Sequence, residues 1–114
     1  RVLIAGVAYK KNVDDMRESP ALELIELIEA RGAQTAFYDP FVSRIPMTRE
    51  HAALAGRDSL PWTLAIAADY DATLIVTEHD GGDYAALAKH APLLVDTRNA
   101  CRRAGVMDPS IVLA

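Results

Sequence analysis

Residues 2–38, VLIAGVAYKKNVDDMRESPALELIELIEARGAQTAFY, contain the pattern that decides the fold class. They begin with the apolar run Val2 to Ala5, which is typical of a buried strand in a parallel sheet. Ser19-Pro20 then gives an N-cap and first-turn signal, and the leucines and isoleucines that follow recur at helical spacing opposite glutamates. Ala33 to Tyr38 forms the next apolar run, which we expect to be a second strand.

The rest of the chain continues this alternation of strands and helices after an irregular connection. The elements predicted there are short helices at 49–54 and 64–68, strands at 72–77 and 93–96, a helix at 84–90 and an edge strand at 111–113. We therefore expect an α/β, Rossmann-like, three-layer domain with a parallel doubly wound sheet. If strands two and three flank strand one, the topological switch point opens beside the C-terminal end of strand one, where ligands of such sheets bind.

The composition is that of one ordinary globular domain, which we place at residues 1–114. Hydrophobic residues make up 51% and charged residues 25% of the 114 residues, and no apolar run is long enough to cross a membrane. A net charge of −4 argues against binding to nucleic acid. The one cysteine, Cys101, cannot form an internal disulfide, so we expect a reducing, cytoplasmic location.

The loop after the first strand departs from the dinucleotide-binding fingerprint Gly-x-Gly-x-x-Gly. Gly6 supplies the first glycine, but Ala8 and Lys11 occupy the other two positions, which argues against a complete small NAD-binding domain. Asp39, at the end of the second strand, has two interpretations. It can be the acid that binds a dinucleotide ribose, or the start of an Asp-Pro turn that ends the strand.

The same loop carries three cationic side chains, Lys10, Lys11 and Arg17, for which phosphate is a natural partner. Lysine offers a point charge and arginine a bidentate fork, so the set suits a diphosphate. The alternative is that these cations pair with Asp14, Asp15 and Glu18 of the loop itself. Composition alone favours neither interpretation.

Several motifs together resemble the C-terminal domain of the UDP-glucose and GDP-mannose dehydrogenase family. They are GVAYKKNVDDMRESPALELIELIEARGA at 6–33, YDP at 38–40 and VDTRNA at 95–100. The resemblance covers essentially the whole chain. The connection IPMTREHAALAGRDSLPW at 45–62 is more similar to the branch that oxidises UDP-N-acetylhexosamines, such as UDP-N-acetylglucosamine, than to the UDP-glucose branch.

This resemblance implies that the chain is the nucleotide-sugar-binding part of a larger enzyme of polysaccharide biosynthesis. Enzymes of the family oxidise the C6 alcohol of the sugar twice, to a uronate, and consume two NAD through a cysteine thioester. An N-terminal domain binds NAD and holds the catalytic cysteine, lysine and aspartate, and a middle helix forms homodimers. We accordingly expect no catalytic residue in this chain and no dehydrogenase activity from it alone. The abrupt start at Arg1, inside or against a strand, fits a fragment.

The resemblance also assigns roles to four residues of this sequence. Tyr9, Lys10 and Arg98 match family positions that contact the substrate, and Arg17 matches one that reaches NAD across the domain interface. Lys10 and Arg98 follow strands one and four, whose C-terminal ends share one edge of a parallel sheet. We therefore expect these two side chains to converge on one anion.

Other reactive residue types receive simpler interpretations. Cys101 is expected to be a small apolar filler or a solvent-exposed thiol rather than a nucleophile. His51, His79 and His90 lack metal-ligand spacing and are assigned to helix or loop surfaces, so no metal is proposed. The alternative to a dehydrogenase domain is a stand-alone nucleotide-binding or regulatory module without catalysis.

Overall fold

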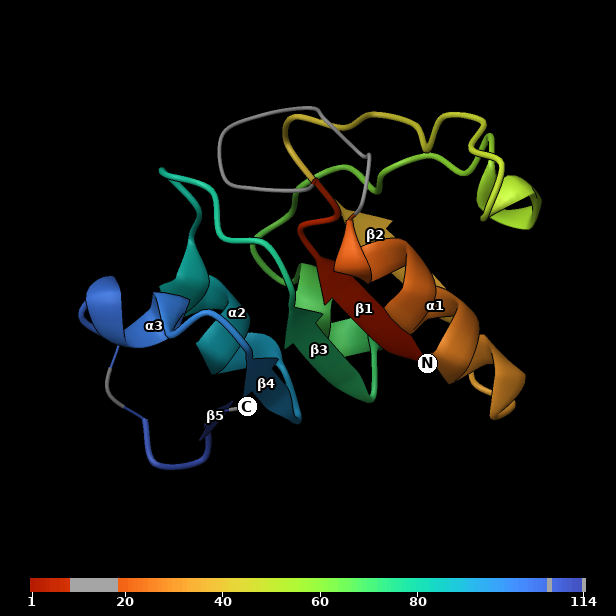
Figure 1. Ribbon diagram of the computed structural model, residues 1–114. Coiled ribbons are helices and arrows are strands. Elements are labelled where there is room, and N and C mark those ends of the chain that lie inside the picture. The colour runs from red at the N-terminus through yellow and green to blue at the C-terminus, as the bar shows by residue number, and fades with distance from the viewer. Residues whose placement is uncertain (9–18, 107, 114) are drawn as a thin grey trace.

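The computed structural model describes residues 1–8, 19–106 and 108–113. Helices and strands alternate along it, as Figure 1 shows. In chain order the elements are β1 (Val2–Ala5), α1 (Pro20–Ala30), β2 (Thr35–Tyr38), η1 (Ala52–Leu54), η2 (Ile66–Asp69), β3 (Ala72–Ile75), α2 (Tyr84–His90), β4 (Leu94–Asp96), α3 (Ala100–Arg103) and β5 (Val112–Leu113).

Within the described residues, five strands form one sheet in the order β2-β1-β3-β4-β5, and every pairing is parallel. Ile4 of β1 lies opposite Phe37 on one side and Leu74 on the other. Strands two and three thus flank strand one, and the predicted α/β, Rossmann-like class with its switch point between β1 and β3 is confirmed.

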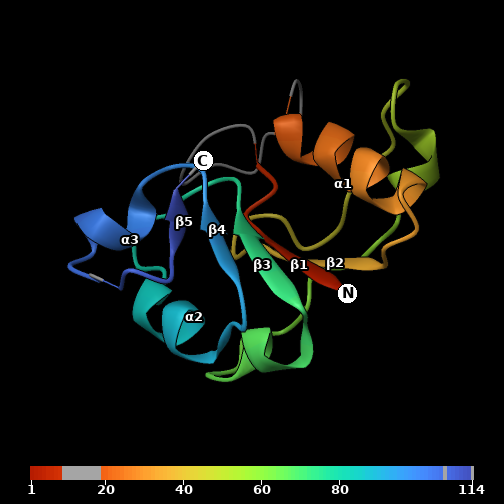
Figure 2. The same ribbon diagram turned by 90° about the horizontal axis from the view of Figure 1, so that it is seen from below.

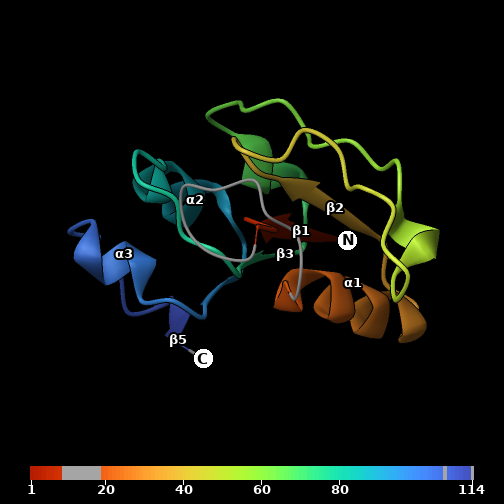
Figure 3. The ribbon, with the colours of Figure 1, turned by 45° about the horizontal axis from the view of Figure 1, so that its top comes forward.

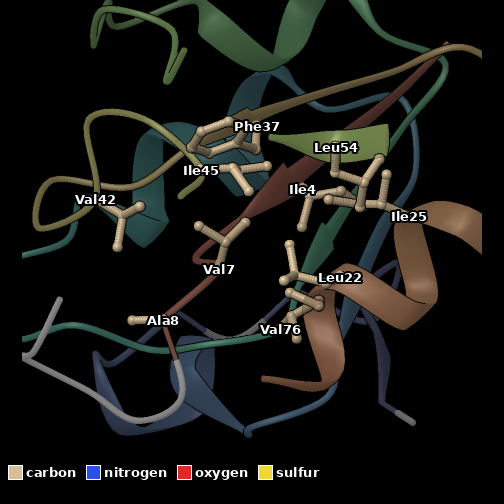
Figure 4. Packing of buried hydrophobic residues seen from close by; sticks show 11 residues of the cluster. Ile4, Val7, Ala8, Leu22, Ile25, Phe37, Val42, Ile45, Leu54 and Val76 are labelled. Carbon is tan, nitrogen blue, oxygen red and sulfur yellow. The ribbon is translucent and has the colours of Figure 1, made fainter. Parts of the chain in front are cut away.

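Helices cover both faces of the sheet. Figures 2 and 3 show α1 on one face and α2 with η2 on the other. Successive side chains of β1 point to opposite faces, so Ile4 belongs to one core and Leu3 to the other. Figure 4 shows the first core, in which Leu22 and Ile25 of α1 pack over Ile4. A strand buried on both faces explains why residues 2–5 are apolar without alternation.

The start of α1 follows the predicted capping signal. The Ser19 Oγ accepts a hydrogen bond from the backbone N–H of Ala21 and donates one to the Val7 carbonyl at 2.6 Å. Pro20 is the first helical residue, where its missing N–H leaves no bond unmade. The cap therefore ties the beginning of α1 to the end of β1.

The first part of the connection between β2 and β3, residues 42–57, packs against the same face as α1. Val42, Ile45 and Leu54 are buried in the first core. Both terminal nitrogens of the Arg57 guanidinium donate to the Glu29 carboxylate of α1, at 2.6 and 3.0 Å. This segment, whose sequence shows little periodicity, thus completes the helical layer on that side of the sheet.

The structure differs from the sequence-based prediction in three respects. The helices expected at 49–54 and 64–68 are the 3-10 helices η1 and η2, and β2, β3, β4 and β5 are each shorter than expected. Helix α3 was not predicted, because Asp96 of the preceding strand caps it and the usual capping residue next to the helix does not. Within the described ranges, no helix is long and apolar enough to cross a membrane.

Candidate functional site

Three strand ends are joined by hydrogen bonds at the C-terminal edge of the sheet. The Thr77 hydroxyl, after β3, donates to the Ala8 carbonyl at 2.6 Å. On the other side of β3, the Thr97 hydroxyl donates to the Ile75 carbonyl at 2.7 Å. The beginning of the first loop and the loop after β4 are therefore both fixed to the end of β3, at the edge where ligands of such sheets bind.

Gly6 allows β1 and β3 to approach each other closely at this edge. Its φ is +86°, and a Cβ placed on it would lie 2.0 Å from the Thr77 carbonyl oxygen. Only glycine combines that backbone conformation with that contact. The first glycine of the incomplete fingerprint thus has a packing role in this chain.

Asp39, just after β2, organises the entrance of the first loop. Its carboxylate accepts hydrogen bonds from the backbone N–H groups of Val7 and Ala8, and from those of Phe41 and Val42. Burial raises the pKa of Asp39. The hydrogen bonds with His79 and with the backbone lower this pKa by more, so it ends below its ordinary value. Of the two interpretations of Asp39, these contacts favour the second, in which the residue begins a turn that ends the strand.

His79 lies inside the protein, so its prediction as a surface residue is wrong. Its side chain is 4% exposed, and Nε2 lies 2.9 Å from Asp39 Oδ2. The Tyr84 hydroxyl lies 2.9 Å from the His79 backbone nitrogen, whose N–H donates to it, and the Phe41 ring packs on the imidazole. Its isolated position in the sequence hid these contacts, because the residues that enclose it come from the segment after β2 and from α2.

The loop after β4 is held by a second buried carboxylate, that of Asp96. It accepts hydrogen bonds from the backbone N–H groups of Arg98, Ala100 and Cys101 at 2.9 to 3.1 Å. Burial raises the pKa of Asp96, and these three bonds lower it by more, which favours the ionised carboxylate. Asp96 therefore fixes the backbone on both sides of Arg98 and Asn99.

A second support of this loop comes from Arg103 of α3. Its guanidinium forms an ion pair with Glu78 and also donates to the Arg98 carbonyl at 2.6 Å. Glu78 is thereby neutralised, whereas the Arg98 guanidinium forms no ion pair with any residue that the structure describes. The loop thus presents one cation whose charge is not compensated by a described neighbour.

An open cleft of about 530 Å³ lies over this loop and the end of β5. We call it the Arg98 cleft; its lining residues are Glu78, Asp96, Thr97, Arg98, Asn99, Arg103 and Leu113. Both of its acids are already occupied, Glu78 by Arg103 and Asp96 by backbone N–H groups. Arg98 is consequently the cation of this lining that has no described ion-pair partner, and its planar guanidinium suits a phosphate.

A second hollow of about 260 Å³ lies on the opposite side of the segment after β3. Its walls include the rings of Tyr38, Phe41, Trp62 and Tyr84. None of its described lining residues is a lysine or an arginine. Because this lining offers no cationic partner for a phosphate, we place the anion site at the Arg98 cleft.

The predicted site residues have different outcomes. Arg98 lies directly after β4, at the predicted edge of the sheet. Tyr9, Lys10 and Arg17 lie outside the described residues, so their convergence with Arg98 stays a prediction. Sequence reasoning missed Asn99, although it directly follows Arg98.

Cys101 is buried in the second core. Of the two predicted roles, apolar filler and solvent-exposed thiol, the structure shows the first. Burial raises the pKa of its thiol to about 12, and the nearby charge of Asp96 adds to this shift. The thiol is therefore protonated at neutral pH and a poor nucleophile. Among the described residues, no cluster of three or more histidines, cysteines or acids could hold a metal ion.

Comparison with known proteins shows which proteins this chain is similar to. Residues 3–103 match the family described as UDP-glucose/GDP-mannose dehydrogenase family, UDP binding domain. A UDP-glucose 6-dehydrogenase from Rhizobium meliloti (strain 1021) is 32% identical over 110 residues, which cover 90% of this chain and 24% of that protein. A UDP-N-acetyl-D-mannosamine dehydrogenase from Methanococcus maripaludis is 28% identical over 101 residues, 87% of this chain and 22% of the relative.

Solved structures show the same fold. An NDP-N-acetyl-D-galactosaminuronic acid dehydrogenase from Methanosarcina mazei Go1 superimposes with a TM-score of 0.69 at 22% sequence identity, and the match covers 99% of this chain and 23% of that one. The chain thus spans about a quarter of the length of these relatives.

Proposed function

Because the chain belongs to the UDP-glucose/GDP-mannose dehydrogenase family, in which it matches the UDP-binding domain, we propose that its Arg98 cleft binds the diphosphate of a UDP-sugar. The observation that carries this proposal is the uncompensated guanidinium of Arg98, on a loop fixed by Asp96 and Arg103. Because the loop backbone at Arg98 is already fixed, little of its conformational freedom remains to be lost when an anion binds.

For the longer protein we propose the two-step, NAD-dependent oxidation of the sugar C6 alcohol to a uronate. NAD and the catalytic groups would belong to an N-terminal domain, and the whole enzyme would be a homodimer or larger, acting in the cytoplasm. Within this chain, Tyr9 and Lys10 would contact the substrate beside Arg98, and Arg17 would reach NAD. The isolated chain should then produce no NADH from any UDP-sugar.

The sugar itself is proposed from the connection at 45–62, which resembles that of enzymes acting on UDP-N-acetylhexosamines such as UDP-N-acetylglucosamine. The relatives include a UDP-glucose enzyme and a UDP-N-acetylmannosamine enzyme at similar identity. Parallel turnover assays of the full enzyme with UDP-glucose and UDP-N-acetylhexosamines would test this choice.

The diphosphate site is tested by titrating the chain with UDP in a calorimeter. A charge-assisted hydrogen bond contributes on the order of 1.5 to 3 kcal/mol, so Arg98→Ala should weaken UDP binding about tenfold or more. Arg98→Lys should restore only part of the affinity, because it keeps the charge and loses the fork. Arg102→Ala is the matched control, since this exposed arginine of α3 does not line the cleft. Equal affinities for the Arg98→Ala variant and the unaltered chain would overturn the proposal.

A further inference from the structure

The side chain of Asn99 contains a buried polar atom without a partner. Its Oδ1 is shielded from solvent and accepts no hydrogen bond from any residue that the structure describes. Leaving a buried acceptor unpaired is costly, and most such atoms in folded proteins are paired. Asn99 also lines the Arg98 cleft, directly beside the proposed anion site.

Capping does not account for this asparagine. It occupies the N-cap position of α3, but its side chain makes no capping hydrogen bond. The N–H group of Cys101, from which an N-cap side chain could accept a hydrogen bond, donates to the Asp96 carboxylate instead. The Asn99 oxygen is therefore not needed for the local structure.

The backbone at Asn99 adds a second observation. Its φ of 59° and ψ of 30° make it the one non-glycine residue with a positive φ among those that the structure describes. Asparagine tolerates this left-handed conformation better than most residues, but glycine adopts it more readily still. A preference for backbone conformation alone would thus be met by glycine, which has no buried amide.

We propose that Asn99 is a specificity-determining residue of the Arg98 cleft: its amide turns toward the cleft when a ligand binds, which breaks no hydrogen bond of Oδ1, and Oδ1 then accepts a hydrogen bond from a neutral N–H or O–H group of the ligand. This inference rests on the proposed binding of a nucleoside diphosphate at the cleft. Arg98 recognises the negative charge, and Asn99 recognises a donor close to it. Phosphate oxygens mainly accept hydrogen bonds, so the donor comes from the base imide, a ribose hydroxyl or a hexose hydroxyl.

The two residues should therefore respond differently to two kinds of ligand. Pyrophosphate carries the charge but has neither a base imide nor a sugar hydroxyl, whereas UDP and UDP-N-acetylglucosamine carry both. Arg98→Ala should weaken all three ligands. Asn99→Gly, which keeps the left-handed backbone accessible, should weaken UDP or UDP-N-acetylglucosamine about threefold to tenfold and change pyrophosphate binding less than twofold.

The experiment is a set of calorimetric titrations of the unaltered chain, Asn99→Gly and Arg98→Ala with the three ligands. A loss with UDP places the donor on the nucleoside, and a loss only with UDP-N-acetylglucosamine places it on the hexose. Unchanged affinity for both nucleotides, or an equal loss for pyrophosphate, would overturn the role of Asn99. If Arg98→Ala also leaves UDP binding unchanged, or if UDP does not bind, the proposed function itself fails.

Ligand analogues provide a test that does not depend on folding of the variant. If the donor lies on the nucleoside, N3-methyl-UDP or 2′,3′-dideoxy-UDP should bind the unaltered chain about threefold to tenfold more weakly than UDP does. If it lies on the hexose, the corresponding deoxy-sugar analogue of UDP-N-acetylglucosamine should show this loss. Equal affinity of all these analogues and their parent nucleotides would contradict the proposal.

Discussion

Asp39 and Asp96 are two buried carboxylates at the C-terminal edge of one sheet, at the ends of β2 and β4, and they fix two loops in different ways. Both accept several backbone N–H groups, and in both cases hydrogen bonds lower a pKa that burial alone would raise. Asp39 also pairs with the imidazole of His79, so its contacts are directed inward. Asp96 binds backbone groups of its own loop and leaves the Arg98 side chain directed to the cleft.

The difference indicates that Asp39 mainly stabilises the fold, whereas Asp96 mainly holds the loop of the proposed ligand site. The contacts of Asp39 connect β1, β2 and the segment after β3, which are distant in sequence. By contrast, the three backbone N–H groups that bind Asp96 all lie within five positions of it in the sequence. Loss of Asp39 should consequently affect the whole domain, and loss of Asp96 should affect mainly the cleft.

The largest effect is expected for Asp39→Ala. It leaves four backbone N–H groups and His79 without their shared acceptor, which should lower the free energy of unfolding by roughly 3–5 kcal/mol. Urea denaturation followed by circular dichroism measures this change. Asp69→Ala, at an exposed position, is the control and should stay within about 0.5 kcal/mol of the unaltered chain. Similar stabilities for the two variants would show that Asp39 has no such structural role.

Asp96→Ala should lower the free energy of unfolding less, by about 2–3 kcal/mol, because it leaves three backbone N–H groups unpaired. It should also weaken UDP binding, about tenfold or more, since Arg98 is no longer held. The same titrations and denaturation curves give both values. Full UDP affinity in a destabilised Asp96→Ala variant would separate the loop from the ligand site and contradict our assignment.

Acid should weaken both carboxylate sites. The pKa of each is lowered in the folded chain, so their contribution is complete above the ordinary carboxyl pKa of about 4 and is lost as pH falls through the lower folded value. Urea denaturation at pH 6, 4 and 3 should show this decline. Asp39→Asn or Asp96→Asn should be less stable at pH 6 but show a shallower decline, and parallel curves would argue against ionised carboxylates at these positions.

The smallest effect is expected for Arg103→Gln. Its ion pair with Glu78 is exposed and contributes little to stability, but the loss of its bond to the Arg98 carbonyl should loosen the loop. We expect UDP affinity to fall about twofold to fivefold, since this guanidinium affects the ligand only through Arg98. Arg102→Gln should leave the affinity unchanged. A loss of the same size in both variants would indicate a general effect of charge.

The sequence predicted the sheet because the signals that form it are local. The buried run at Val2, the Ser19-Pro20 cap and the apolar periodicity of α1 each depend on neighbouring residues. The role of Arg98 was expected from a motif. The pairing of His79 with Asp39 could not be predicted, because these residues are 40 positions apart and meet only after the sheet forms. Helix α3 was missed for a related reason, since its capping acid lies within a strand.

The close approach at Gly6 has a consequence for the recombination of such domains. Suppose that the loop after β1, including position 6, is exchanged between two related domains. The new loop fits only if its residue at position 6 leaves room for the backbone carbonyl of residue 77. Gly6 and Thr77 therefore form one unit of exchange, although 71 positions separate them. A chimera that places any larger residue at position 6 must also move the backbone after β3, and with it the segment that separates the two hollows.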